Sequence, residues 1–340
     1  MEPVSTSSRV RPPTIRDVAR HARVGVGTVS RVLNDSPLVS DDARTRVRRT
    51  IDDLGYRPSS TARSLSLGRT QTIGVVVPFF TSGSVLERLR GVVERLRQWG
   101  EYDLLLFDVE TVAQRADAFR DFARGDRVDG LLVVSLPLTD DEVAGLRREG
   151  LPVVLVDVGH PALPHVAIDD VRGGELATEH LLGKGHERIG FVGDEPSPFG
   201  FTASELRRRG LRRALRRAGI KPRSGWERRG PHGREPARAL AQRLLTTKDP
   251  PTAIFAASDV QAMGVLDAAR RAGRHVPRDL AVIGFDDIEV AAALDLTTVR
   301  QPLRDIGARG AELLLSAIEG VTPPSFDELA PLTVVERGTT

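Results

Sequence analysis

Cysteine is absent from this 340-residue chain. That absence excludes a disulfide scaffold, a thiol nucleophile and a thiolate metal site. Long apolar segments are absent too: the longest run, residues 73–80, has eight residues, which is too few to cross a bilayer as a helix. Residues 1–8 lack the apolar core of a signal peptide. We therefore expect a cytoplasmic protein that does not associate with a membrane.

Lysine is rare, and the charge is unevenly spread. Only three of the 49 basic residues are lysine, a bias that we attribute to genome composition more than to chemistry. Residues 1–69 contain 13 Arg and seven acidic residues, a net charge of +6, whereas the remaining 271 residues contain 36 basic and 39 acidic groups, a net charge of −3. A basic segment joined to a mildly acidic body is typical of a nucleic-acid-binding module attached to another domain.

The length suits two or three domains, and the sequence texture divides the chain accordingly. Residues 1–13 are polar and contain two adjacent prolines, so we expect a flexible arm. Residues 14–57 have a dense helical pattern that ends in Gly-Tyr-Arg, and residues 58–70 are a short, weakly apolar connection. The texture then changes completely, and residues 71–340 form the body of the protein.

Short apolar runs alternate with amphipathic segments of helical length throughout residues 71–340. This alternation predicts βαβ units, with parallel sheets covered by helices on both faces. Thr72–Val76 and Arg188–Val192 resemble one another, and each opens a new series of elements. We infer a duplication, and therefore two similar lobes with a ligand cleft between them. The predicted strands are residues 73–78, 103–107, 130–134, 153–156, 189–192, 253–256 and 280–285.

Residues 14–54 predict three helices. Thr14 is a candidate N-cap for the first helix, and Asp17 three residues later approximates a capping box. A turn at residues 23–25 leads to a second short helix, residues 26–34, and Ser40 caps the third. We expect the helices to pack through one apolar stripe on each, formed by Ile15, Val18, Ala19 and Ala22, by Val29, Val32 and Leu33, and by Val47, Ile51 and Leu54.

The outward face of the second helix carries small or hydrogen-bonding side chains and one arginine. A helix in the major groove needs close approach, phosphate contacts and a bidentate donor for guanine, which this face offers. Spacing and charge leave two alternatives open: a generic three-helix bundle and a helical dimerisation arm. A dinucleotide site at residues 25–27 is rejected, because no strand precedes it and the third glycine is missing. The face consists of Val26, Gly27, Thr28, Ser30, Arg31 and Asn34.

Several motifs occur in an order typical of one family. Thr14–Ala19, Val24, Thr28–Asn34 and the segment from Tyr56 to Leu65 resemble the signature of the LacI/GalR family of bacterial transcription regulators. Motifs of the body agree with this resemblance, which extends from residue 14 to about residue 336: Asp169–Gly174, Leu182–Ile189, Ala256–Asp259, Val282–Asp287 and Leu296–Pro302.

The resemblance implies an α + α/β fold. A three-helix helix-turn-helix domain and a hinge helix would precede a periplasmic-binding-protein-like core of two Rossmann-like lobes. In this family the chain crosses between the lobes three times. That implies a first lobe of about residues 71–165 and 296–322, and a second lobe of about residues 166–295 and 323–340.

The resemblance also implies an interface with double-stranded DNA. A homodimer would bind a pseudo-palindromic operator, because one recognition helix covers only half a site. The hinge would fold in the minor groove, with Leu65 wedged between base pairs and with Ala62 allowing the two hinges to approach each other. The implied DNA-contacting residues are Thr14, Val26, Gly27, Thr28, Ser30, Arg31, Asn34, Tyr56, Ser59, Ala62, Arg63 and Leu65.

A small-molecule effector in the cleft follows from the same resemblance, which favours a sugar over a nucleobase. Arginine and carboxylate side chains suit vicinal hydroxyls, and aromatic side chains suit the face of a sugar ring. The implied effector-binding residues are Phe79, Phe80, Asp157, Arg207, His232, Ser258 and Asp286. Ser258 departs from the family, which often has Asn at that position.

An α/β enzyme and an exported solute-binding protein are the other functional classes that these lobes allow. The sequence has no G-x-S-x-G elbow, and His180 and His186 are six residues apart, which does not place them on one helix face. The basic N-terminal segment argues against an exported binding protein. We therefore expect no catalytic residues, no metal and no cofactor.

Overall fold

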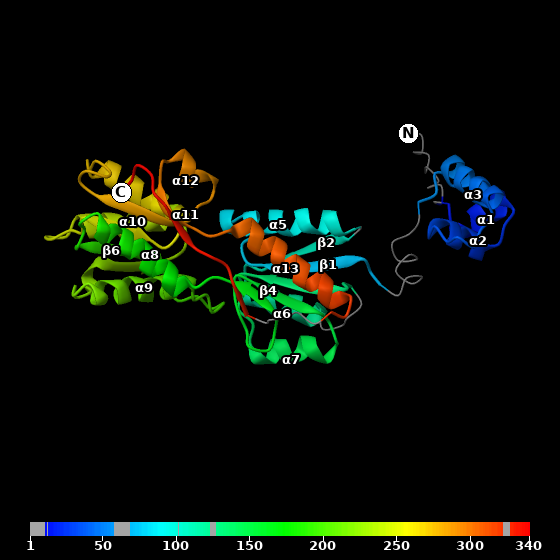
Figure 1. The fold of residues 1–340 in the computed structure, drawn as a ribbon, viewed down its shortest axis with the longest axis horizontal. Helices are drawn as coiled ribbons and strands as arrows, with labels where there is room; N and C mark the ends of the chain where they lie inside the picture. The colour runs from blue at the N-terminus through cyan, green and yellow to red at the C-terminus, as the bar shows by residue number, and fades with distance from the viewer. Residues whose placement is uncertain (1–10, 12, 58–68, 101, 123–126, 322–326) are drawn as a thin grey trace, which may run out of the picture. The chain divides into compact units, whose positions relative to one another are not determined.

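The computed structural model describes residues 11, 13–57, 69–100, 102–122, 127–321 and 327–340. The chain forms two compact units, residues 1–70 and 71–340 (Figure 1). Four predicted DNA-contacting residues of the hinge lie outside the described residues: Ser59, Ala62, Arg63 and Leu65. No helix in the described part of the chain is long and apolar enough to span a membrane.

The N-terminal unit contains the three predicted helices, α1 (Ile15–Ala22), α2 (Val26–Leu33) and α3 (Asp41–Leu54). The capping box is confirmed, because the Thr14 hydroxyl accepts from the Asp17 N–H and the Asp17 carboxylate accepts from the Thr14 N–H at 2.9 Å. The helices pack through the predicted stripes, with Val18, Val29 and Val47 fully buried at the centre.

Two six-stranded sheets form the body, one in each lobe. The first sheet contains β1 (Thr72–Val77), β2 (Asp103–Asp108), β3 (Gly130–Val134), β4 (Val153–Val156), β5 (His165–Ala167) and β11 (Asp327–Leu329). The second contains β6 (Ile189–Asp194), β7 (Glu227–Gly230), β8 (Ala253–Ala256), β9 (Ala281–Asp286), β10 (Thr297–Arg300) and β12 (Thr333–Val335). All pairings are parallel except that of β10 with β12.

Helices cover both faces of each sheet (Figure 1). In the first lobe, α5 (Gly83–Trp99) and α13 (Leu303–Ile318) lie on one face, and α6 (Val112–Phe122) and α7 (Asp140–Arg148) on the other. In the second lobe, α8 (Asp170–Gly183) and α9 (Ala203–Arg217) lie opposite α10 (Arg234–Leu245) and α11 (Asp259–Arg271). A short helix, α12 (Glu289–Ala293), follows β9.

The predicted duplication is visible in the strand order. The first sheet reads β2-β1-β3-β4-β5-β11 and the second reads β7-β6-β8-β9-β10-β12. The two orders are the same when β1 is matched with β6. The two segments that resemble one another in sequence, Thr72–Val76 and Arg188–Val192, therefore occupy equivalent strands.

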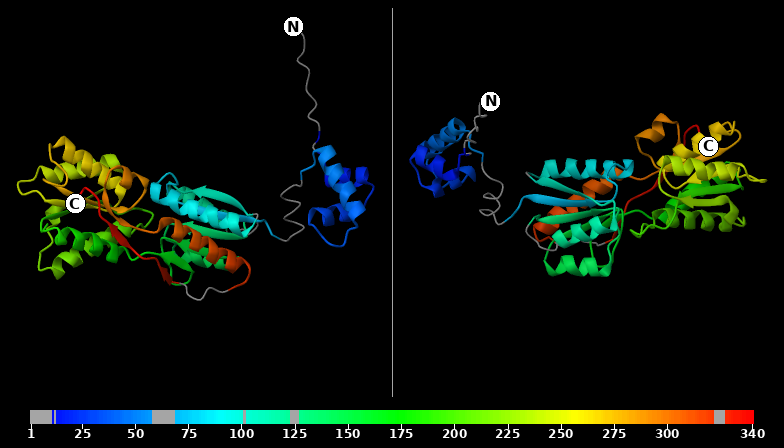
Figure 2. Two further views of the ribbon diagram at one scale, coloured as in Figure 1. Left: turned by 45° about the horizontal axis from the view of Figure 1, so that its top comes forward. Right: turned by 180° about the vertical axis from the view of Figure 1, so that it is seen from behind.

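The chain crosses between the lobes three times (Figure 2), and the strand pairings place each crossing later in the sequence than the resemblance implied. β5 pairs with β4 in the first lobe, so residues 166–167 belong there and the crossing follows them. β10 pairs with β9, so residues 297–300 belong to the second lobe rather than the first. β11 pairs with β5, so residues 327–329 belong to the first lobe. In each case, the chain completes the strand that pairs with its sheet before it crosses to the other lobe, so the boundary falls after that strand.

Candidate functional sites

The recognition face of α2 is accessible. Val26 is 43% exposed, Gly27, Arg31 and Asn34 are exposed, and Thr28 and Ser30 are half-buried. Val29 and Val32 point into the core of the unit. Gly25 caps the helix without a side-chain hydrogen bond, so the first N–H groups of α2 have no side-chain acceptor, a condition that favours phosphate.

Ion pairing distinguishes Arg31 from five other arginines of this unit. Arg20 pairs with Asp17, Arg44 and Arg48 pair with Asp35, Arg46 pairs with Asp42, and Arg49 lies near Asp53. Arg16, Arg23 and Arg31 form no ion pair with any described residue. Carboxylates therefore balance much of the positive charge on the other faces, and Arg31 on α2 keeps its charge available.

The side chains of Thr14 and Tyr56 make contacts within the N-terminal unit itself. The Thr14 hydroxyl lies 2.7 Å from an Asp17 oxygen, and this bond and that of the Thr14 N–H hold the pKa of Asp17 below its ordinary value. Tyr56 is 8% exposed and is part of the core of the unit; burial raises the pKa of its hydroxyl. At most a small part of the Tyr56 side chain is left for contact with DNA.

In the body, Arg207 is held in a buried position on α9. The apolar stripe of this helix contains Leu211, Ala214 and Leu215, and Arg207 lies on the same side. Its Nε donates to Asp170 at 2.8 Å, its Nη1 donates to the Ala257 carbonyl at 2.6 Å, and its Cζ lies 3.6 Å from the centre of the Phe285 ring.

Two predicted carboxylates lie at the carboxyl ends of equivalent strands, as parallel-sheet ligand sites require. Asp286 ends β9, and its Oδ1 lies 3.8 Å from Nη1 of Arg207. Asp157 follows β4 and accepts from the Ser135 hydroxyl at 2.8 Å. Both have positive φ values, 122° and 73°, a strained backbone of the kind that clusters at functional sites.

A hydrogen-bonded chain connects these two carboxylates across the lobes. The Gln301 amide donates to Asp286, and its carbonyl oxygen accepts from Nη2 of Arg88 at 2.9 Å. The same Arg88 nitrogen donates to Asp157. Gln301 lies between β10 and α13, where the chain crosses, so the chain of contacts includes both lobes and their connection.

Burial disfavours ionisation of two carboxylates of this polar cluster, Asp170 and Asp286. It raises the pKa of Asp170 to about 6, although Arg207 opposes the shift, and the nearby Asp157 charge adds to it. Burial also raises the pKa of Asp286, again against the charges of Arg207 and Arg88. Clusters of opposed charges with perturbed pKa values are typical of functional sites.

Ser258 and His232 are linked to each other through two further polar residues, Gln261 and Asp194. Ser258 caps α11 and contacts Gln261 at 3.2 Å; the Gln261 amide donates to Asp194 at 2.8 Å. His232 lies 3.1 Å from the same Asp194 oxygen. That hydrogen bond raises the pKa of His232, and the charge of Asp286 adds to the effect.

The two predicted phenylalanines differ. Phe79 contacts Phe199 and Phe201 of the other lobe, with ring centres 6.1 and 6.4 Å apart. Phe199 and Phe201 stack on each other at 5.5 Å. Phe80 is 39% exposed, and its N–H donates to Asp108, which is not a member of the cluster.

Several residues of this cluster were not predicted from the sequence. Asp170 and Gln301 lie within motifs that carry the family resemblance, but neither was predicted as a site residue. Arg88 had a detectable signal, because it falls on the apolar stripe of its helix with Val85, Val92 and Leu96. Phe199 and Phe201 lie in a loop without periodicity.

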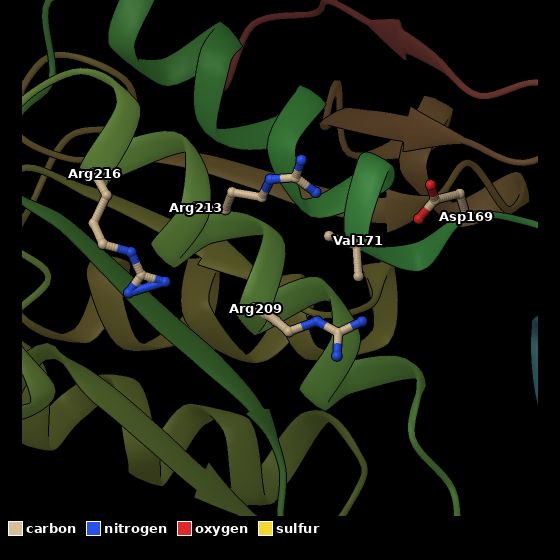
Figure 3. Close-up of a pocket in the computed structure, with 5 residues that line it drawn as sticks. All are labelled: Asp169, Val171, Arg209, Arg213 and Arg216. Carbon is tan, nitrogen blue, oxygen red and sulfur yellow. The ribbon is translucent and has the colours of Figure 1, made fainter.

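A separate surface cavity of about 450 Å³ lies outside this cluster (Figure 3). It is lined by Asp169 and Val171 of the α8 end and by Arg209, Arg213 and Arg216 of α9. The three consecutive arginines of α9 therefore have different surroundings. Arg207 is buried, Arg208 pairs with Glu205 and Glu227, and Arg209 faces this cavity. Within the described residues, no group of three His, Asp or Glu side chains is arranged to hold a metal ion.

Comparisons with known proteins find similarity in both units of the chain. A family model described as "Bacterial regulatory proteins, lacI family" matches residues 14–59, and a "Periplasmic binding protein-like domain" matches residues 178–340. The ribose operon repressor of Escherichia coli is 34% identical over 334 residues, which cover 96% of this chain and 99% of that protein. The HTH-type transcriptional repressor PurR of Photobacterium profundum is 35% identical over 312 residues, covering 90% and 92%.

Solved structures are similar over the same extent. The lac repressor dimer bound to operator and the anti-inducer ONPF has a TM-score of 0.84 at 27% identity, covering 97% of this chain and 99% of that one. A CelR–cellobiose complex has a TM-score of 0.71 at 32% identity, covering 96% and 100%. A helix-turn-helix unit joined to a two-lobed ligand-binding core defines a DNA-binding transcriptional regulator with an effector domain. The chain belongs to the lacI family of bacterial regulatory proteins, and it is a transcriptional repressor of this family.

Proposed function

We propose that the protein binds a pseudo-palindromic operator as a homodimer and that a neutral sugar in the cleft between the lobes controls this binding. The observation that carries the proposal is the cluster of the buried Arg207 and Asp286 with the half-buried Asp157, which is connected through Gln301 from one lobe to the other. A ligand held there contacts both lobes, so it favours one arrangement of them over another.

The DNA interface in this proposal is the exposed face of α2. Arg31 reads a guanine, and Gly27, Thr28, Ser30 and Asn34 approach bases and phosphates. By resemblance, the hinge residues Ser59, Ala62, Arg63 and Leu65 contact the minor groove. Two copies of α2 are needed, because one recognition helix covers half a site.

The preference for a sugar rests on the chemistry of the cluster. Carboxylates accept from vicinal hydroxyls, guanidinium groups donate to them, and the rings of Phe79, Phe199 and Phe201 offer an apolar face. Relatives support this reading, since one solved structure is a cellobiose complex and one relative is a ribose operon repressor. A nucleobase is the second candidate, because the stacked pair Phe199 and Phe201 also suits a flat heteroaromatic ring.

The DNA part of the proposal is tested with an operator selected by the wild-type protein from random duplexes. We expect Arg31→Ala to reduce the preference for that operator over random DNA by about 10- to 100-fold, since a bidentate contact is worth about 1–3 kcal/mol of discrimination. Arg46→Ala is the matched control, because Arg46 is already paired with Asp42. An equal loss on all sequences would instead identify Arg31 as a phosphate contact.

The effector part is tested by thermal shift with D-ribose, D-glucose, cellobiose and hypoxanthine. A ligand at about 100 times its dissociation constant stabilises the folded core by roughly 2.7 kcal/mol. We expect a sugar to raise the melting temperature of the wild-type protein and not that of Asp286→Ala. A shift with hypoxanthine alone would contradict the sugar assignment.

A further inference from the structure

Arg88 is a buried arginine to which neither the fold nor the family resemblance gives a function. It is 2% exposed, and it lies on the apolar stripe of α5 with Val85, Val92 and Leu96. Burial of a charged group is costly unless its partners compensate. The position therefore needs an explanation beyond packing, because an aliphatic residue would fit the stripe without this cost.

The duplication makes Arg88 the counterpart of Arg207. The first strand of each lobe is followed by a helix, α5 or α9, and each helix carries one buried arginine three residues before a glycine, Gly91 or Gly210. Each arginine also lies near a carboxylate at the end of the fourth strand of its lobe, Asp157 for Arg88 and Asp286 for Arg207. The two lobes thus present the same pair of groups to the cleft.

Close helix crossings fix the backbone of both arginines. A Cβ atom on Gly307 of α13 would lie 2.0 Å from the Arg88 carbonyl oxygen. A Cβ atom on Gly174 of α8 would lie 2.0 Å from the Arg207 carbonyl oxygen. Only glycine allows these contacts, so the neighbouring helix holds each arginine in place before any ligand arrives.

The hydrogen bonds of the two arginines differ. Arg207 uses Nε and Nη1 within the protein. Within the described residues, Arg88 uses only Nη2, for Asp157 and Gln301, and its Nε is shielded from solvent and has no acceptor. A buried donor on a charged group without an acceptor costs free energy, and native proteins rarely retain one without a reason.

We infer that Arg88 is a second effector-binding arginine, whose free Nε–H edge receives a hydroxyl or carbonyl oxygen of a neutral polyhydroxyl ligand. The inference rests on the proposed effector function of the cleft and names the group by which the first lobe holds the ligand. Arg207 then acts from the second lobe, and the ligand bridges the two.

Charge balance favours a neutral ligand. The cluster contains two arginines, Arg88 and Arg207, and three carboxylates, Asp157, Asp170 and Asp286. The arginines are therefore already compensated, and an anionic ligand would add uncompensated negative charge in a buried site. A neutral polyol adds acceptors for Arg88 and donors for the carboxylates without changing the charge.

Isothermal titration of the full-length protein with D-ribose, D-glucose, cellobiose and D-glucuronate tests the inference. We expect a neutral sugar to bind the wild-type protein, and Arg88→Met to weaken that binding about 30-fold. Arg88→Lys keeps a positive charge beside Asp157 but lacks the Nε–H edge, so we expect a similar loss. D-glucuronate should bind more weakly than D-glucose.

Arg95→Met is the matched control on the same helix. Arg95 also has a shielded Nε without an acceptor, but it pairs with Glu312 and lies over the Trp99 ring, two turns beyond Arg88. We expect its sugar affinity to remain at the wild-type value. A loss in Arg95→Met equal to that in Arg88→Met would show a general effect on α5 and would overturn the inference.

Two further outcomes separate this inference from the proposed function. If Arg88→Lys and Arg88→Met bind the sugar within threefold of wild type while Asp286→Asn abolishes binding, the role of Arg88 is wrong and the effector cleft stands. If no sugar of the panel binds the wild-type protein, or if Asp286→Asn leaves binding intact, both are wrong.

Discussion

Replacing Asp170 by asparagine is expected to stabilise the protein at neutral pH, although Asp170 forms a buried ion pair with Arg207 at 2.8 Å. Burial raises the pKa of Asp170 from its ordinary value of 3.8 to about 6. The folded state therefore binds this proton more tightly than the unfolded state does. The contribution of Asp170 to stability is fully present below the unfolded value and is lost as the pH rises through about 6.

The size of the effect follows from the difference between the two pKa values. At about 1.4 kcal/mol per pH unit, ionising Asp170 in the folded protein costs about 3 kcal/mol relative to the unfolded chain. Asparagine has nearly the shape of the protonated acid, keeps an oxygen for Nε of Arg207, and carries no charge. Arg207 loses one charged partner in this variant and retains Asp286, so we expect a net gain of about 1–2 kcal/mol at pH 7.5.

Urea unfolding of the wild-type protein and Asp170→Asn at pH 7.5 and pH 4.5 measures this difference. The comparison between the two proteins matters, because carboxylates with lowered pKa values, such as Asp249 and Asp267, change the stability of both in the opposite direction. We expect the advantage of asparagine to be present at pH 7.5 and to shrink by about 1–2 kcal/mol at pH 4.5. A variant that is less stable than wild type at pH 7.5, or a difference that does not change with pH, would refute the reasoning.

Three other predictions concern packing and the cleft. Gly307→Ala places a Cβ 2.0 Å from the Arg88 carbonyl oxygen and should lower the free energy of unfolding by about 1–3 kcal/mol in urea titrations. Gly183→Ala, whose added Cβ would have no atom within 4 Å, should leave that free energy unchanged. Equal effects of the two substitutions would contradict the close crossing of α5 and α13. Tyr56→Ala should increase the rate of amide hydrogen exchange in residues 41–54, because the Tyr56 ring is part of the core of the N-terminal unit. Tyr56→Phe should leave this rate unchanged. Unchanged exchange in Tyr56→Ala would contradict the burial of the ring. Phe201→Ala should weaken sugar binding by about three- to tenfold, since an aromatic pair is worth about 0.5–1.5 kcal/mol; an unchanged dissociation constant in calorimetry would exclude this ring from the site.

Sequence periodicity was sufficient to predict the helices and strands that bury an apolar face. The seven predicted strands and the three N-terminal helices are present, because continuous apolar runs and 3.6-residue stripes have few other arrangements. Strand β7 was missed because Glu-Arg-Arg-Gly contains no apolar residue. Among the described strands it pairs with β6 alone, at the edge of its sheet, where side chains reach solvent and no apolar run is required.

The lobe boundaries and half of the polar cluster could not be predicted without the structure. β5 has three residues, too few to give a pattern, and β10 was assigned to the wrong lobe because strand pairing is a non-local property. The resemblance pointed to Arg207 and Asp286, which the structure brings within 3.8 Å of each other. Arg88 was not predicted as a site residue, because only its place on the apolar stripe of α5 distinguishes it from the many solvent-exposed arginines of the chain.

The central claim is that the cleft controls DNA binding, and the most direct test is operator affinity with and without sugar. Fluorescence anisotropy of the selected operator would be titrated with the wild-type protein, with and without saturating amounts of the panel sugar that raises its melting temperature. We predict a change in operator affinity of at least tenfold, with a reciprocal change in sugar affinity when operator is bound, and the loss of both changes in Asp286→Asn. A sugar that saturates the wild-type protein while its operator affinity stays within twofold would contradict the account.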